Sequence, residues 1–175
     1  DVYKRQDEYK DYVFIDDGWA KNGTYCIIRR IQIHIETWDR TALEEQEATF
    51  GRKRISGAPL TGKKEFDEMD LGAKDSSGEY VIPADAHARL AHEAKTSIKR
   101  RAYNYTAGTN DKTGALETGL LFISFQKATQ QFIDIQNHLG HKDKLNEYIT
   151  HRASATFIVL PGVKKGGYLG ETLFD

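Results

Sequence analysis

Hydrophobic and polar residues alternate most regularly between Thr24 and Thr37, in the segment TYCIIRRIQIHIET. One side of this segment carries hydrophobic residues at a spacing of two, with one arginine among them: Tyr25, Ile27, Arg29, Ile31, Ile33 and Ile35. The other side is mostly polar. Because the side chains of a β-strand point alternately to its two faces, this pattern predicts a long strand with one buried face.

A helix is expected directly after this strand. The segment TALEEQEATFGR places Thr41 three residues before Glu44, the spacing of a capping box, in which each side chain bonds to a backbone N–H of the first turn. Gly51 can adopt the left-handed conformation that often ends a helix. We therefore predict a helix from Thr41 to about Phe50.

The second half of the chain predicts two strands, a helix and a last strand. The helix begins near Ala128 and carries a hydrophobic stripe formed by Phe132, Ile135 and Leu139. The strands combine β-branched, aromatic and alternating residues between turn-forming segments. They are Ser97–Tyr105, Gly119–Gln126 and Ser154–Gly162.

The order strand, helix, strand, strand, helix, strand is typical of the ferredoxin-like, or split βαβ, arrangement. We predict an α+β fold whose antiparallel sheet carries its helices on one face. Residues 54–95 interrupt this order, because they are rich in glycine and charge and show no hydrophobic period. A long insertion without regular structure is unusual in a compact domain, and is most often functional or disordered.

Composition limits the class of protein to which the chain can belong. Its 175 residues suffice for one domain with a buried core, and 39% hydrophobic with 29% charged residues is typical of a globular protein. The net charge of −1 argues against a protein that binds mainly nucleic-acid phosphates. The single cysteine, Cys26, cannot form an internal disulfide. No hydrophobic run approaches the roughly 20 residues of a membrane-spanning helix.

Two residues in or just after the insertion are candidates for chemistry. His87 lies between Ala86 and Ala88, small neighbours that leave room for a flat group beside the imidazole. It is either a metal ligand or an ordinary packed histidine. Arg100 falls on the apolar side of its predicted strand, where an unpaired charge would be costly. Its partner is a carboxylate of the protein, a cofactor propionate or a reacting oxygen species.

Two further interpretations concern other residues. His138 and His141 have a spacing that zinc can use, but no third ligand lies nearby, and their interaction with the end of the helix dipole explains them better. The ferredoxin-like order also fits an RRM-like sheet that binds single-stranded nucleic acid through exposed aromatic residues. Phe122 and Phe125 alternate to opposite faces, however, which is unlike a stacking platform.

Five segments together resemble a known family. The runs GTYCIIRRIQIHIETWDRTALEEQEATFGRKRISGAPL, VIPADAHARLAH, IKRRAYNY, GLLFISFQ and LNEYITHRASATFIVLPG occur in the order and at the spacing of the C-terminal half of dye-decolourising (DyP-type) haem peroxidases. The resemblance extends from about Tyr12 to Gly162. It is strongest to the deferrochelatase/peroxidase (EfeB) subgroup.

The resemblance implies that haem b (iron protoporphyrin IX) lies between the sheet and the helices, with its ligand carried by the long insertion. His87, in DAHARLA, would be the iron ligand on the proximal side of the haem. Arg100 would be the catalytic residue on the opposite, distal side. Glu147 would accept a hydrogen bond from the second ring nitrogen of His87. The residues expected near a haem propionate are His92, Glu93 and Ala94, where AHEAK departs from the Asn/His-Pro-Arg of the family.

The implied activity is that of a peroxidase, which reduces hydrogen peroxide while it oxidises an electron donor. Release of iron from haem is a further activity of the subgroup. The distal aspartate of the family lies upstream of the strand that precedes Asp16 and Asp17, which match the turn after that strand. We therefore expect the N-terminal half of the parent protein, with that aspartate, to be a partner of this chain.

Resemblance to the subgroup also implies an exported protein, although the sequence shown contains no signal peptide. The first six residues, DVYKRQ, resemble translated adaptor sequence, so the predicted domain covers residues 7–175. We expect no nucleic-acid partner and no membrane span. The sequence leaves open whether the protein forms a homo-oligomer.

Overall fold

The most regular alternating segment of the sequence forms the middle of a sheet. The computed structural model describes residues 6–140 and 142–174. In it, β1 (Thr24–Ile33) pairs antiparallel with β4 (Leu116–Gln126) on one side and with β5 (Ile149–Val159) on the other. β2 (Lys99–Arg100) and β3 (Tyr103–Thr109) pair with the other edge of β4. The resulting strand order, β2–β4–β1–β5, is that of a ferredoxin-like sheet and confirms the predicted fold.

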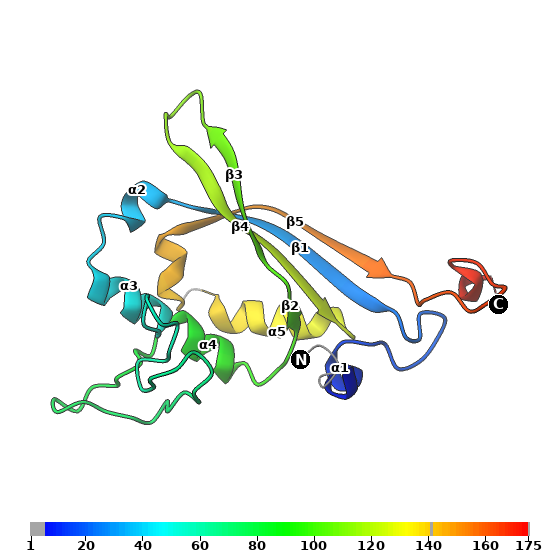
Figure 1. Cartoon of the computed structure of the whole chain (residues 1–175), viewed down its shortest axis with the longest axis horizontal. Coiled ribbons are helices and arrows are strands. Elements are labelled where there is room, and N and C mark those ends of the chain that lie inside the picture. The colour runs from blue at the N-terminus through cyan, green and yellow to red at the C-terminus, as the bar shows by residue number, and fades with distance from the viewer. Residues whose placement is uncertain (1–5, 141, 175) are drawn as a thin grey trace.

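The main helices form a layer beside this sheet (Figure 1). α5 (Thr129–Leu139) packs on the sheet through Phe132, whose ring centroid lies 5.9 Å from that of Phe122 in β4. α4 (His87–Glu93) packs against α5 and against α3 (Leu43–Phe50). The short helices are α1 (Gln6–Tyr12), α2 (Ile35–Trp38) and the 3₁₀ helices η2 (Lys144–Glu147) and η3 (Glu171–Leu173).

Several predicted boundaries differ from those of the structure. The first strand ends at Ile33 rather than Thr37, because the chain turns into α2. The predicted capping box of Thr41 is wrong: the hydroxyl of Thr41 donates to the carbonyl of Thr37, and Ala42 is the residue that precedes the helix. Gly51 does end α3, with a φ of +73°. The residues predicted as a non-native start include 1–5, which lie outside the described part of the chain.

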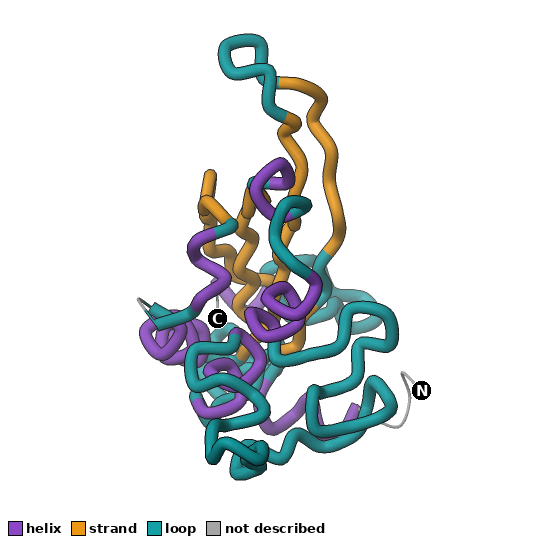
Figure 2. The backbone as a smooth tube through the Cα atoms, turned by 90° about the vertical axis from the view of Figure 1, so that its left-hand side faces the viewer, coloured by secondary structure: helices purple, strands orange, loops and turns teal. Residues whose placement is uncertain are grey.

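The long insertion contains α4 and is held to it by one arginine. Arg89 is 9% exposed, and its Nη1 donates to the carbonyls of Leu71 and Ile82, at 3.0 Å in each case. Its guanidinium also lies over the ring of Tyr80, and its Nε donates to Glu93 at 2.9 Å. Figure 2 shows the loops gathered around the helices, away from the β3–β4 hairpin. The insertion is therefore an ordered support for α4.

A small buried core completes this support. Ala58, Ile82 and Ala86 are at most 1% exposed. Gly51 lies so close to them that a Cβ added there would stand 2.9 Å from Cγ2 of Ile82. Since Gly51 also has a positive φ, glycine is required here both by conformation and by space. The end of α3 and the start of α4 are thus fixed against each other.

Candidate functional site

His87 is the first residue of α4, and a buried carboxylate fixes its ring. Nδ1 of His87 donates to Oδ2 of Asp143 at 2.6 Å, and the side chain of Asp143 is only 3% exposed. When a carboxylate takes the N–H of one ring nitrogen, the other nitrogen keeps its lone pair for a ligand. No hydrogen bond joins Nε2 of His87 to another part of the chain that the structure describes. The Nε2 atom of His87 is therefore available for a ligand, which is consistent with the predicted role.

Asp143 is held by the short helix that it begins. Its Oδ1 accepts the backbone N–H of Leu145 at 2.9 Å, so it is the N-cap of η2 and both carboxylate oxygens are used. The backbone N–H of Lys144 donates to the carbonyl of Asp85, which ties the start of η2 to the residues just before α4. Two hydrogen bonds between the same segments thus orient the His87 ring.

The prediction that Glu147 is the partner of His87 is wrong. Glu147 lies at the other end of η2 and is exposed, whereas Asp143, four residues earlier, makes the hydrogen bond. The charge of Glu147 instead acts on Lys144, whose pKa is raised mainly by its bond to Glu45 and more weakly by Glu147. An Asp directly before a short helix was the pattern in the sequence that could have identified the partner.

Aromatic rings line the other side of His87. The ring of Phe50, the last residue of α3, stands edge-to-face to the imidazole with centroids 6.3 Å apart. Trp38 contacts Phe50 in the same manner at 5.5 Å, and Tyr148 at 4.9 Å. Such edge-to-face pairs are favourable and restrict the orientation of each ring. The imidazole is therefore fixed by packing as well as by its carboxylate.

Arg100 lies on the sheet face that the helices cover. Its partner in register is Ser124, and the neighbour of Ser124 in β1 is Ile27. Residues opposite each other in antiparallel strands point to the same face, and Phe122, two residues from Ser124, points toward α5. Arg100 thus lies on the face of the sheet toward the helix layer, to which His87 belongs.

Two polar groups on this sheet face, one buried and one exposed, have no partner in the described part of the chain. Ser124 is fully buried, and its hydroxyl has no hydrogen-bond partner in the described chain. Arg100 is exposed, and no ion pair or hydrogen bond joins it to a described residue. Buried polar atoms are nearly always bonded to protein, water or a ligand. Both groups are consistent with a ligand between the sheet and the helices.

A second arginine, Arg29, lies on the same face of the sheet. Its Nε donates to Ser154 at 2.8 Å, its Nη1 bonds to Gln136, and the guanidinium stacks over Phe132. Burial lowers the pKa of Arg29, because the charged form is poorly solvated. The pKa of His151 is lowered as well, first by burial and then by the charge of Arg29. This part of the face therefore favours an anionic group.

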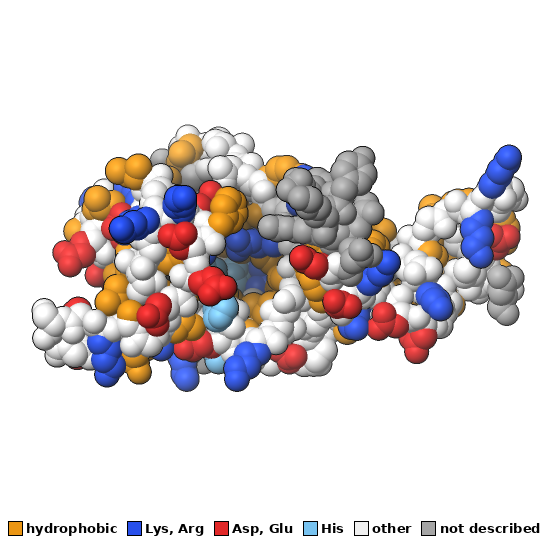
Figure 3. All heavy atoms as spheres, turned by 60° about the horizontal axis from the view of Figure 1, so that its bottom comes forward, with side chains coloured by type: hydrophobic (Ala, Val, Ile, Leu, Met, Phe, Trp, Pro, Cys, Tyr) orange, Lys and Arg blue, Asp and Glu red, His pale blue; other side chains and the backbone are white. Residues whose placement is uncertain are grey.

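The space between these layers suits a flat prosthetic group better than a bare metal ion. Figure 3 shows a hollow in this side of the molecule, with basic and histidine side chains gathered in and around it. Within the described residues, no three His, Cys, Asp or Glu side chains converge to hold a metal. A single imidazole with a carboxylate behind it is a sufficient protein ligand only where the other ligands come from a macrocycle.

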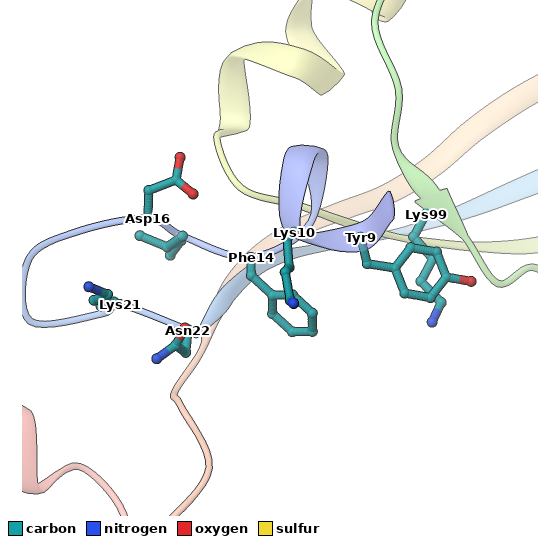
Figure 4. Close-up of a pocket in the computed structure, with 8 residues that line it drawn as sticks. Tyr9, Lys10, Phe14, Asp16, Lys21, Asn22 and Lys99 are labelled. Carbon is teal, nitrogen blue, oxygen red and sulfur yellow. The ribbon is translucent and has the colours of Figure 1, made fainter. Parts of the chain in front are cut away.

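One cavity of the molecule lies away from this space. It has a volume of about 610 Å³ and is bordered by α1, the loop after it and Lys99 (Figure 4). Nζ of Lys99 lies over the ring of Tyr9, 4.0 Å from its centroid. Because consecutive residues of a strand point to opposite faces, Lys99 and Arg100 project to different sides of β2. This cavity is separate from the space between sheet and helices.

Comparison with known proteins settles which family has this arrangement. Residues 3–164 match the family described as Dyp-type peroxidase, C-terminal. The chain belongs to this family. A deferrochelatase of Yersinia pestis is 39% identical over 167 residues, which are 91% of this chain and 38% of that relative. A dye-decolorizing peroxidase of Thermobifida fusca is 37% identical, over 90% of this chain and 37% of the relative.

Solved structures of DyP-type proteins have the same fold. A DyP-type peroxidase from Cellulomonas bogoriensis superposes with a TM-score of 0.91 at 38% identity, covering 97% of this chain and 48% of that one. Ferric DtpA from Streptomyces lividans gives 0.90 at 34% identity, with 96% and 48% covered. The chain thus spans less than half the length of these relatives.

Three further DyP-type site predictions fall at the end of α4. His92 is exposed, Ala94 follows the last helical residue, and Glu93 lies between Arg89 at 2.9 Å and His138 at 3.7 Å. Their placement near a haem propionate stays a prediction. Glu93 thus contacts Arg89 within α4 and His138 of α5, and these contacts support the packing of the two helices.

The other interpretations of the sequence find no support in this DyP-type domain. Phe122 packs on Phe132 and so is not part of an exposed stacking surface. His141 lies outside the described residues, so the predicted spacing with His138 cannot form a site among them. Asp16, which was distinguished from the distal aspartate, is engaged with Lys127 at 3.0 Å. None of the described helices is long and apolar enough to cross a membrane.

Proposed function

We propose that this chain is the haem-binding part of a DyP-type peroxidase, which reduces hydrogen peroxide while it oxidises an electron donor. The observation that carries the proposal is the hydrogen bond from His87 to the buried Asp143. This hydrogen bond occupies Nδ1 and leaves Nε2 as the nitrogen that would bind the iron. Relatives named as peroxidases and deferrochelatases support the same conclusion.

His87 and Asp143 would act together on the proximal side. Haem, when bound, supplies the iron centre that exchanges electrons with peroxide and with the donor. Asp143 accepts the Nδ1 proton of His87, which keeps the Nε2 lone pair available and increases the basicity of the ring. Phe50 restricts the ring orientation through its edge-to-face contact. The chain itself therefore provides a complete proximal ligand.

Arg100 would act on the distal side by charge. A guanidinium can stabilise the negative charge that develops on a peroxide oxygen as the O–O bond breaks. It cannot accept the peroxide proton, because arginine does not lose its own proton in proteins. Since no described carboxylate pairs with Arg100, we infer that the proton acceptor belongs to the further polypeptide present in the longer relatives.

We propose a non-covalently held haem b. Attachment of haem through thioether bonds requires a Cys-x-x-Cys-His segment, whereas the sequence contains a single cysteine. That residue, Cys26, is 6% exposed within β1. A haem without covalent links to the protein is consistent with this composition.

The test is a titration of the 175-residue chain with haem, followed by its absorption spectrum. We expect a Soret band typical of histidine ligation for the wild type and its loss in His87→Ala, with partial recovery when free imidazole is added. His34→Ala is the control, since His34 is not among the residues predicted to contact haem and its Nε2 is hydrogen-bonded to Thr150 at 2.8 Å. Identical spectra of the wild type and His87→Ala would refute the proposal.

A further inference from the structure

A second, smaller cavity is bordered by Phe50, the residue whose ring contacts His87. Its volume is about 280 Å³, which is enough for a molecule of one or two rings. α2 and α3 form one side, and the segment that follows α3 forms the other. The lining residues are Trp38, Gln46, Phe50, Arg52, Lys53 and Arg54.

Three consecutive cations border this cavity without an ion-pair partner among the described residues. Arg52 donates to the carbonyls of Gly57 and Glu65 at 2.7 and 2.9 Å, and Nζ of Lys53 to the carbonyl of Gly62 at 3.2 Å. These acceptors are neutral, so neither residue forms an ion pair within the described chain.

Arg54 likewise has no ion-pair partner among the described residues. Its guanidinium donates to the side-chain oxygen of Gln46 at 2.8 Å, which is also a neutral acceptor. The carboxylate of Glu47 is bonded to the backbone N–H of Arg54 rather than to the guanidinium. Three neighbouring positive charges that form no ion pair among the described residues attract an anion to a concave surface.

Buried contacts hold the walls of the cavity in place. Gln46 is 2% exposed, and its Nε2 donates to the carbonyls of Trp38 and Thr41 at 2.8 and 3.1 Å. Because its oxygen also accepts Arg54, one side chain connects α2, α3 and the cationic segment. Trp38 and Phe50 present two mutually perpendicular rings. Rings and fixed cations together suit a ligand that is both planar and anionic.

We propose that this cavity binds a planar aromatic carboxylate or sulfonate, with its rings against Trp38 and Phe50 and its acidic group toward Lys53 and Arg54. The ligand would lie two ring contacts from His87, through Phe50. Nevertheless, binding at this cavity needs no haem, so it can fail or hold independently of the proposed function.

The experiment follows tryptophan fluorescence of the 175-residue chain during titration with naphthalene-2-sulfonate. Trp38 and Trp19 are the two tryptophans, and Trp19 lies outside the cavity, so Trp19→Phe leaves Trp38 as the reporter. We expect saturable quenching. Removal of charge in Lys53→Gln and Arg54→Gln should weaken the affinity about tenfold each, since each removes a charge-assisted contact.

Matched controls separate this site from general adsorption. Lys63→Gln and Lys64→Gln remove exposed cations outside the cavity and should leave the affinity unchanged. The neutral analogue naphthalene-2-carboxamide should bind at least about tenfold more weakly. Circular dichroism checks that each variant is folded, and calorimetry repeats the titration without a fluorescent reporter. Absence of saturable binding, or equal affinity for the wild type and both cavity variants, would overturn the proposal.

Discussion

The helix layer and the sheet face that border the hollow differ in how completely this chain fixes their polar groups. On the helix side, His87 is bonded to a buried carboxylate and packed against an aromatic ring. On the sheet side, Arg100 is exposed and unpaired among described residues, and the buried hydroxyl of Ser124 has no partner there. The polar groups of the first region are fixed by contacts within the chain, whereas those of the second have no partner among the described residues.

This difference has a physical reason. A ligand imidazole needs one tautomer and one orientation before the metal group arrives, which a carboxylate and ring packing provide. A guanidinium that acts on developing negative charge gains by having no internal counter-ion, because an ion pair would offset its charge. Substitutions on the helix side should therefore change stability, whereas substitution of Arg100 on the sheet side should change reactivity.

The largest effect is expected for Arg100→Ala in the haem-loaded parent protein. Loss of a charge directed at the developing oxyanion should slow the reaction with peroxide by about 100- to 1,000-fold. Unfolding free energy should change by no more than about 0.5 kcal/mol, because an exposed side chain without partners is removed. Stopped-flow absorption and denaturant titration measure the two quantities. Unchanged peroxide kinetics would contradict the distal role.

The next largest effect is expected for Asp143→Ala, with Glu147→Ala as its control. Loss of the carboxylate removes both the bond to His87 and the N-cap of η2. We expect haem affinity to fall about 10- to 100-fold and the unfolding free energy to fall by about 1–3 kcal/mol. Haem titration and urea denaturation should show no comparable change for Glu147→Ala. The reverse ranking would restore the prediction made from the sequence.

A third effect concerns the support of α4. Arg89→Ala leaves the buried carbonyls of Leu71 and Ile82 without their donor, which should cost about 1–3 kcal/mol of unfolding free energy. Hydrogen exchange should increase in residues 71–82 and in α4, but not in β1. Lys95→Ala, at an exposed residue just after α4, is the control. Uniform exchange rates across the two regions would mean that the insertion is not held through Arg89.

The sequence predicts the sheet better than the insertion, because the sheet has a local pattern and the insertion does not. Alternation is a local property, so β1 and β4 could be located and their antiparallel order deduced. α4 has no comparable local pattern, because Arg89 is buried at a position that composition alone would assign to solvent. Its stability comes from carbonyls 7 and 18 residues away in the chain.

The candidate site was predictable to a similar extent. The resemblance predicted His87 and Arg100 as site residues, and they lie in α4 and β2 respectively. The partner of His87 lies 56 residues further along the chain. A position transferred from a family motif selected Glu147, although only the folded chain reveals that Asp143 is the acid that is buried. Local capping geometry, rather than motif spacing, determines which carboxylate reaches the ring.

The smallest effect concerns pH and the sheet face. Burial and the charge of Arg29 lower the pKa of His151 below its ordinary value of 6.5. Below that value the unfolded chain therefore binds more protons at this site than the folded chain, so unfolding becomes easier as the pH falls. We expect a small decrease in the urea midpoint from about pH 8 to about pH 5, reduced by solvent screening. His151→Asn should flatten this part of the profile, and Arg29→Gln should flatten it less, since burial is the larger cause. A profile that is equally steep in the wild type and His151→Asn would show that His151 is not the group whose titration makes stability depend on pH in this range.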